Sequence, residues 1–432
     1  MNCDERLAAC LNQKLAPTLD LLKQMVAINS FTANKAGLNE LGRFTAKAFQ
    51  PLGFTADFVA STNPDYGDHL VLTRKGKSRR TIGMISHLDT VYPPEEEKRN
   101  DFLWRVAGDK IYGPGTMDIK GGTVMMHLVL SAMREVYPQD FEDTNWTLLL
   151  NSSEEALSYD FGELCLERLC ADYNSPSPGG EGRGEGGTSR FKPPCDAIAA
   201  LVFEAGVREG DTFEMVTARK GRATFRVTVE GRGAHAGGDH ERGANAVVQL
   251  AHTVQRIAAL TDYSKELTFN VGNISGGTVA NRVPHHAVAE LEMRAFSREI
   301  YNAGVEALKK LSEDIVVRAA ADKSPCRVTI EKLSETPPWP RNEMTESLLR
   351  VWQETGKSLG LRVIREERGG LSDGNHICHK IPTLDGLGPR GDNAHCSEQS
   401  ADGSKEQEFV EVSSFVPKAA LNIEAIRRLL AT

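Results

Sequence analysis

Residues 81–91 read TIGMISHLDTV, an apolar run that ends in His87 and Asp89. Three similar runs occupy residues 146–150, 197–203 and 381–387, and stretches with helical spacing separate the runs. Continuous apolar runs between helices are typical of buried strands in a parallel sheet. The pattern therefore predicts an α/β domain with a mostly parallel central sheet.

The helices are predicted from apolar side chains that repeat at helical spacing. Residues 3–29 carry such a pattern, and residues 38–52 carry a second one that ends at a Pro-Leu-Gly breaker. A third helix is expected at residues 123–137, directly after a glycine-rich loop.

A second domain is predicted between residues 219 and 333, where apolar and polar side chains alternate along the first strand. Helices are expected at 244–260 and 298–319, and further strands at 267–271, 287–296 and 327–333. The order βαββαβ indicates a ferredoxin-like insertion. We therefore assign residues 1–217 and 334–432 to a discontinuous catalytic domain and residues 218–333 to the inserted domain. Residues 174–194 are rich in Gly, Ser and Pro and are expected to form a flexible surface insertion.

The composition excludes several classes of protein. The chain has 432 residues, 51 Lys and Arg against 59 Asp and Glu, and a formal net charge of -8, which disfavours nucleic-acid binding. No apolar run approaches the ~20 residues of a membrane-spanning helix. Eight scattered cysteines without a C-x-x-C pair indicate neither a disulfide framework nor a thiolate zinc site, which favours a reducing cytoplasm.

Each apolar run leads to side chains that bind metals. These are His87, the adjacent Glu154 and Glu155, Glu204, and finally His395. The carboxyl ends of strands in open α/β sheets are where binding sites gather. A sixth candidate, Asp118, lies in the loop GPGTMDIKGG, and its two oxygens could bridge two cations.

Each candidate also has a simpler explanation when it is taken alone. His87 could be a strand-end histidine, Asp118 a helix cap, and the Glu154–Glu155 pair the solvated start of a helix. Adjacent carboxylates after a buried strand repel each other, however, and nearby cations would relieve that repulsion. Two histidines and three carboxylates at the ends of one sheet favour a two-metal site.

The motif order HLDTV, GPGTMDIKGG, NSSEEA, FEAG, GRGAHAG and a late histidine resembles the M20 family of zinc peptidases and deacylases. The resemblance covers nearly the whole chain apart from residues 174–194. It implies two zinc ions per subunit, with cobalt as a possible substitute, and a peptide after the bridging aspartate that is often cis, here Asp118–Ile119. The implied roles are His87 and Glu204 on one ion, Glu155 and His395 on the other, Asp118 between them, Asp89 supporting His87, and Glu154 as general base.

The resemblance also assigns roles to the inserted domain, which would form a homodimer or a lid. His235, in GRGAHAG, would donate a hydrogen bond to the oxyanion in a neighbouring subunit's active site. Asn281 and Arg294 match positions that hold a substrate carboxylate, and Gly370 lies in a glycine-rich loop beside the substrate pocket. Arg294 has an alternative explanation as an outward strand arginine paired with Glu290 or Glu292.

The implied function is zinc-dependent hydrolysis of an amide bond next to a carboxylate-bearing amino acid. A glutamate-carboxypeptidase-like exopeptidase acting on small peptides is the leading hypothesis, and an N-acyl-amino-acid deacylase is the alternative. From another class, the chain could be a metal-binding scaffold without activity. Glu154 and His235 argue against the scaffold, because neither is needed to hold zinc.

Overall fold

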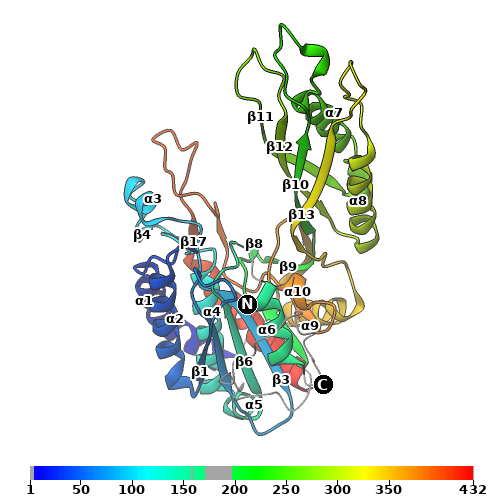
Figure 1. Cartoon of the computed structure of the whole chain (residues 1–432). Coiled ribbons are helices and arrows are strands. Elements are labelled where there is room, and N and C mark those ends of the chain that lie inside the picture. The colour runs from blue at the N-terminus through cyan, green and yellow to red at the C-terminus, as the bar shows by residue number, and fades with distance from the viewer. Residues whose placement is uncertain (1–3, 157–158, 171–196, 432) are drawn as a thin grey trace, which may run out of the picture. The chain divides into compact units, whose positions relative to one another are not determined.

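The computed structural model describes residues 4–156, 159–170 and 197–431 (Figure 1). The expected insertion at 174–194 lies outside these residues. Contacts divide the chain into two compact units: the first contains residues 1–217, 341–367 and 372–432, and the second contains residues 218–340 and 368–371. Among the described residues, no helix is both long and apolar enough to cross a membrane.

The first unit contains a six-stranded sheet in the order β1-β2-β6-β3-β7-β15. Strands β6, β3, β7 and β15 run parallel, whereas β1 and β2 add antiparallel pairs at one edge. The sheet is therefore mixed around a parallel centre, as expected for an α/β fold. The strands span Thr55–Val59 (β1), His69–Arg74 (β2), Thr81–His87 (β3), Asn145–Asn151 (β6), Ala199–Val202 (β7) and Thr383–Leu384 (β15).

Helices cover both faces of this sheet. Successive side chains of a strand point to opposite sides, and apolar side chains on each side pack against helices. Met84, Leu148 and Leu150 pack into a core shared with α1, α2, α4, α9 and α11. Ile85 and Leu149 face the other way and pack against α6 and α10. These helices span Glu5–Val26 (α1), Lys35–Phe49 (α2), Lys120–Val136 (α4), Tyr159–Leu169 (α6), Glu343–Leu359 (α9), Gly374–Ile377 (α10) and Phe415–Ala431 (α11).

Capping residues explain where several helices begin and end. The Asp4 side chain accepts a hydrogen bond from the amide of Arg6 at the start of α1. Asn342 accepts one from the amide of Thr345 at the start of α9, which ends at Gly360 with φ 74°. A residue in this left-handed conformation after a helix is commonly glycine, because glycine lacks a Cβ.

Two small sheets complete the first unit. One has the order β16-β17-β5-β4 and the other β14-β9-β8. In the first, β17 joins the segment after residue 396 to the hairpin before Asp118, with Phe409 paired to Tyr112. The strands span Arg105–Ala107 (β4), Lys110–Tyr112 (β5), Val207–Glu209 (β8), Thr212–Arg219 (β9), Arg362–Arg368 (β14), Gly391–Asp392 (β16) and Phe409–Glu411 (β17). Short helices α3 (Pro94–Arg99) and α5 (Pro138–Asp143) lie in connections.

The second unit is an antiparallel sheet in the order β11-β12-β10-β13, with α7 and α8 packed on one face. Its chain order is βαββαβ, the ferredoxin-like arrangement. Along β10, buried residues alternate with partly exposed ones, so only one face of the sheet is covered by helices. The elements span Gly221–Glu230 (β10), Ala246–Ala258 (α7), Thr268–Gly276 (β11), His286–Ala295 (β12), Arg298–Lys310 (α8) and Arg327–Thr336 (β13).

The sequence overestimated the second helix of this unit. The expected helix at 298–319 ends at Lys310 and a short 3-10 turn follows. The amides of Val316 and Val317 donate hydrogen bonds to the Gln249 side chain in place of bonds within a helix. Strand β13 runs on to Thr336, three residues beyond position 333, because its pairing with β10 extends to Arg222.

Candidate metal centre

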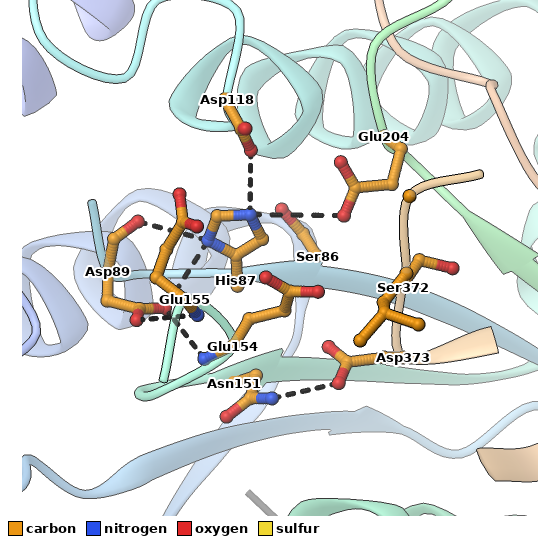
Figure 2. Close-up of polar contacts among 12 residues, drawn as sticks. Ser86, His87, Asp89, Asp118, Asn151, Glu154, Glu155, Glu204, Ser372 and Asp373 are labelled. Atoms are coloured by element: carbon orange, nitrogen blue, oxygen red, sulfur yellow. Dashed lines mark hydrogen bonds and ion pairs between the residues drawn. The ribbon is translucent and has the colours of Figure 1, made fainter. Parts of the chain in front are cut away.

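His87 is the last residue of β3 and is almost fully buried. Its Nδ1 lies 3.0 Å from the main-chain oxygen and 3.4 Å from Oδ1 of Asp89. Its Nε2 lies 3.0 Å from Oδ1 of Asp118 and 3.9 Å from Oε1 of Glu204 (Figure 2). One ring nitrogen thus faces Asp89, and the other faces two carboxylates.

A second group forms around His395, in the loop after β16. The His395 Nε2 lies 3.3 Å from Oδ2 of Asp118 and 3.2 Å from Oε2 of Glu155. In each group, one potential ligand atom from every member lies within 4.8 Å of the others, and Asp118 belongs to both groups. The peptide Asp118–Ile119 is cis. The structure therefore brings together five side chains that the sequence singled out as metal ligands.

The sheet explains why these side chains meet. His87 follows β3, Glu154 and Glu155 follow β6, and Glu204 follows β7. These three strands are parallel neighbours, so their carboxyl ends lie at one edge of the sheet. Figure 2 shows the carboxylates of Asp118, Glu155 and Glu204 around the His87 ring.

The two histidines are strongly basic in this arrangement. Burial disfavours the charged ring of His87, yet hydrogen bonds to Asp118 and Asp89 outweigh it and raise the pKa of His87 well above its usual value. Hydrogen bonds to Asp118 and Glu155 raise the pKa of His395 to about 11. Each ring would have to release its proton from the nitrogen that binds a cation.

Glu154 lies beside the two groups but belongs to neither. Its amide donates to Oδ1 of Asp89 at 3.0 Å, and the amide of Glu155 donates to Oδ2 at 3.1 Å. Burial and the neighbouring charges of Glu204 and Asp373 raise the pKa of Glu154 well above its usual value, although His87 opposes the shift. The carboxylate thus lies in a strongly negative environment, where a nearby cation would favour its ionised form.

The second unit holds His235 on an exposed loop. Its Nδ1 accepts hydrogen bonds from the amides of Gly237 and Gly238, at 3.1 and 3.0 Å. Accepting them requires a lone pair on Nδ1, so the neutral ring carries its proton on Nε2. Asn281 lies next to this loop, and its main-chain oxygen accepts a bond from the amide of Ala236. Nε2 of His235 is therefore prepared to act as a hydrogen-bond donor.

Arg294 and Asn281, both expected to hold a substrate carboxylate, are not brought together. Asn281 precedes β12, whereas Arg294 lies near the far end of that strand, and the stretch from His286 to Arg294 spans roughly 25 Å at the usual strand rise. The Arg294 guanidinium binds both carboxylate oxygens of Glu292, at 2.9 and 3.2 Å, and donates to the Gly369 oxygen. This is the ion pair that the alternative explanation of Arg294 described. The oxygen of Gly370 accepts from Arg219.

Comparison with known proteins identifies the relatives of this chain. Residues 217–323 match the M20 peptidase dimerisation domain. The chain is 28% identical over 400 residues to carboxypeptidase G2 of Pseudomonas sp. (strain RS-16), covering 91% of this chain and 84% of that protein. The chain is therefore similar to peptidases of the M20 family.

Two further similarities accompany these matches. An acetylornithine deacetylase of Pectobacterium carotovorum is 23% identical over 349 residues, which cover 77% of this chain and 80% of the relative. The crystal structure of the aminopeptidase PepT from Bacillus cereus matches with a TM-score of 0.71 and 21% identity, covering 97% of this chain and 99% of that one. In sequence the chain is thus similar to a carboxypeptidase and a deacetylase, and in fold it is similar to a solved peptidase.

Sequence reasoning missed several residues that support the candidate metal centre. The Thr32 hydroxyl donates to Oδ2 of Asp89 at 2.7 Å. Asn151 donates to Asp373 at 2.8 Å, and burial raises the pKa of Asp373 to about 7. Glu408 bonds to the main chain beside Asp118. None of these residues stands in a pattern with metal-ligand spacing, although Asn151 opens the motif NSSEEA and Asp373 lies in the segment GGLSDG.

Proposed function

We propose that this chain is a two-zinc hydrolase that cleaves the amide bond next to a carboxylate-bearing amino acid, as a glutamate-carboxypeptidase-like exopeptidase. The observation that carries the proposal is the pair of donor groups that share Asp118, with Glu154 beside them and outside both. His87 and Glu204 would hold one ion, and Glu155 and His395 the other. Asp118 would contribute one oxygen to each.

The chemistry of the donor set fits zinc. Imidazole nitrogens and carboxylate oxygens are ordinary zinc ligands, and cobalt accepts the same set. Oε1 of Glu155 is buried and has no hydrogen-bond partner within the described part of the chain. A buried carboxylate oxygen without a partner is costly, and a cation would satisfy it.

When bound, zinc polarises a carbonyl group and makes water more acidic near neutral pH. Glu154 would take a proton from the attacking water as the water oxygen bonds to the carbonyl carbon. The same carboxyl group would then deliver that proton to the amine nitrogen as the C–N bond breaks. Asp89 holds the amides of Glu154 and Glu155 and contacts the His87 ring, so it would fix the base and two ligands relative to one another.

His235 would supply the remaining catalytic contact. Its Nε2–H is suited to donate to the carbonyl oxygen as negative charge develops there. The similarity of residues 217–323 to a dimerisation domain supports a homodimer in which His235 serves the partner's centre. The alternative of an inactive scaffold gives no role to Glu154 or His235.

The substrate carboxylate is assigned to the second unit. Asn281 lies beside the His235 loop and would reach the substrate together with it. For Arg294 to bind a substrate, its guanidinium would have to exchange Glu292 for the substrate carboxylate, with Gly370 in the neighbouring loop. A guanidinium binds both carboxylates in the same two-point geometry, so the exchange conserves its hydrogen bonds.

The similarity to acetylornithine deacetylase favours N-acyl-amino-acid deacylation as the second candidate. Both reactions use the same metal ligands and general base, so the leaving amino acid and the acyl group distinguish them. Turnover of dipeptides with C-terminal glutamate, compared with N-acetyl amino acids, decides between the two. A higher kcat/KM on the dipeptides supports the exopeptidase, whereas the reverse order supports the deacylase.

Metal removal tests the proposal directly. We expect close to two zinc ions per chain by elemental analysis, loss of activity on exhaustive chelation, and recovery on adding zinc or cobalt. The control is chelated protein given magnesium, which prefers an octahedral oxygen site and should restore little. Full activity in protein shown to be metal-free would refute the proposal.

A further inference from the structure

Glu408 is a fully buried carboxylate just before β17, in a part of the chain that the metal-binding motifs do not include. Its Oε1 accepts hydrogen bonds from two successive amides, Met117 at 2.8 Å and Asp118 at 3.2 Å. Its Oε2 accepts the hydroxyl of the buried Tyr92 at 2.7 Å. Both oxygens are therefore hydrogen-bonded to other groups of the protein.

The two hydrogen bonds that Oε1 accepts fix the main chain at the point where the Asp118 side chain begins. Asp118 is the one residue common to both donor groups, with Oδ1 near His87 and Oδ2 near His395. A shift of its backbone would displace both oxygens at once. The position of Asp118 thus controls the geometry of both sites.

The main chain of Glu408 is attached to the other ligand loop. Its amide donates to the oxygen of Cys396 at 2.8 Å, directly after His395. His395 itself has φ 65°, in the left-handed region, so its loop needs support from neighbouring segments. Glu408 therefore contacts the Asp118 loop through its side chain and the His395 loop through its backbone.

The charge of Glu408 has a counterpart in Lys120, which is also buried and interacts electrostatically with Glu408 and Glu97. The Lys120 Nζ donates to the main-chain oxygen of Ile28. A neutral glutamine could accept the same two hydrogen bonds at Oε1, from the amides of Met117 and Asp118, and donate one to the Tyr92 oxygen. Hence the effect of the hydrogen bonds of residue 408 can be separated experimentally from the effect of its charge.

We infer that Glu408 is a positioning residue that holds the Asp118 and His395 loops in register for two cations, an inference that rests on the proposed metal centre. Partners that orient a metal ligand typically contribute 10- to 100-fold to metal affinity. Because Asp118 belongs to both donor groups, loss of the Glu408 hydrogen bonds should weaken the binding of the first and of the second cation together.

Two substitutions separate position from charge. Glu408→Asp keeps the charge but withdraws the carboxylate by one methylene group, so it no longer reaches both amides. Glu408→Gln keeps the reach and removes the charge. Glu406→Ala is the matched control, because Glu406 stands two residues away and likewise accepts a tyrosine hydroxyl, that of Tyr112. Metal-free protein would be titrated with Co²⁺ by calorimetry and visible absorption, after circular dichroism and thermal unfolding establish that each variant folds.

The positioning role predicts that Glu408→Asp lowers the affinity for both Co²⁺ ions by roughly 10- to 100-fold. The affinity of Glu408→Gln should stay within about threefold of wild type. Glu406→Ala should bind Co²⁺ with the wild-type affinity. A larger loss in Glu408→Gln than in Glu408→Asp would assign the effect to charge and overturn the inference. If Glu408→Asp does not fold, a loss above about tenfold in Glu408→Gln overturns it alone. Normal binding by all variants also overturns it and leaves the metal centre intact, whereas a wild type that binds no Co²⁺ removes the metal centre itself.

Discussion

The carboxylate of Asp89 contacts four partners. It faces the Nδ1 of His87, accepts the amides of Glu154 and Glu155, and accepts the hydroxyl of Thr32. Only the first contact was predictable from the sequence, because alternation along a strand puts residues 87 and 89 on one side. The others depend on how separate segments pack. Asp89 therefore couples the orientation of the candidate metal ligand His87 to that of the proposed general base Glu154.

Glu154 and Glu155 are adjacent in sequence and should behave differently when substituted. In the proposed site Glu154→Gln removes proton transfer without removing a ligand, so kcat should fall by roughly a thousandfold or more while the zinc content stays near the wild-type value. Glu155→Gln removes a ligand oxygen near His395, so it should lose about one zinc per chain. Elemental analysis and steady-state kinetics on both variants measure the contrast. Zinc loss in Glu154→Gln would show that Glu154 is a ligand.

His127 should make stability depend on pH. Burial in α4 lowers the pKa of His127 to about 4, with help from Lys14 and Arg134, although a bond to the Ala48 main chain opposes the shift. The unfolded chain, with a pKa near 6.5, takes up a proton that the folded chain refuses. The free energy of unfolding should therefore fall as pH drops from 6.5 towards 4, with a slope of at most about 1.4 kcal/mol per unit.

The variant His127→Gln isolates this effect, because glutamine can keep a bond to the main chain but does not titrate. Urea unfolding across that pH range should show wild type losing about 2–3 kcal/mol relative to the variant at the acidic end. Parallel curves would mean that His127 does not contribute.

At the scale of elements, the sequence predicted buried elements better than exposed or short ones. The runs that became β3 and β6 are buried throughout, so their apolar pattern was unambiguous. β1 was not predicted, since its side chains are exposed or only partly buried. Only Thr383–Leu384 of the run at 381–387 forms a strand, β15. The apolar side chains of Ile381 and Leu387 are buried although these residues do not pair as part of a strand.

In the candidate site, residues marked by a local sequence pattern could be predicted, and residues marked only by long-range contacts could not. Its five ligand candidates could be predicted because each follows an apolar run or a glycine-rich loop. Glu408 could not, because it bonds to residues some 290 positions away, and no local pattern marks that contact. The segment around Glu408 is held beside the Asp118 loop by the pairing of β17 with β5, two strands of only three residues each.

Strand β11 and helix α7 form the edge that we expect to make the dimer. β11 is an edge strand, and exposed apolar side chains gather there: Val248 on α7 is 53% exposed and Ile274 on β11 is 56% exposed. A Cβ added at Gly276 of β11 would lie 2.9 Å from Val247, which places α7 against this strand. An exposed apolar patch at a strand edge is typical of an interface.

Aspartate at Ile274 or Val248 should therefore give monomers, because it would bury a charge in the interface. Sedimentation analysis measures the mass, and Leu333→Asp is the control, since Leu333 is 43% exposed on β13 at the opposite edge of the sheet. A dimer that survives both substitutions but not Leu333→Asp would place the interface on β13.

For the whole molecule, the proposed function divides one reaction between two units. The ligand candidates and Glu154 lie in the first unit, and His235 lies in the second. If each His235 serves the partner's centre, then dimerisation is a condition of catalysis. Monomers made by substitution at the β11 edge should then bind zinc normally yet lack activity. Zinc binding by the first unit and dimerisation through the second unit could thus be lost separately.

Pairing two inactive chains tests this division. In a heterodimer of His235→Ala with Glu154→Gln, the first chain keeps its metal ligands and Glu154, while its partner supplies an intact His235. One of the two sites should then work, giving about half the wild-type turnover per dimer. The two chains would carry different tags, be co-expressed and be purified through both tags, with each parental homodimer assayed beside them. If His235 served its own subunit, both sites of the heterodimer would lack one essential group, and the mixture would be as inactive as its parents. Activity in the verified heterodimer therefore requires that His235 act across the subunit boundary.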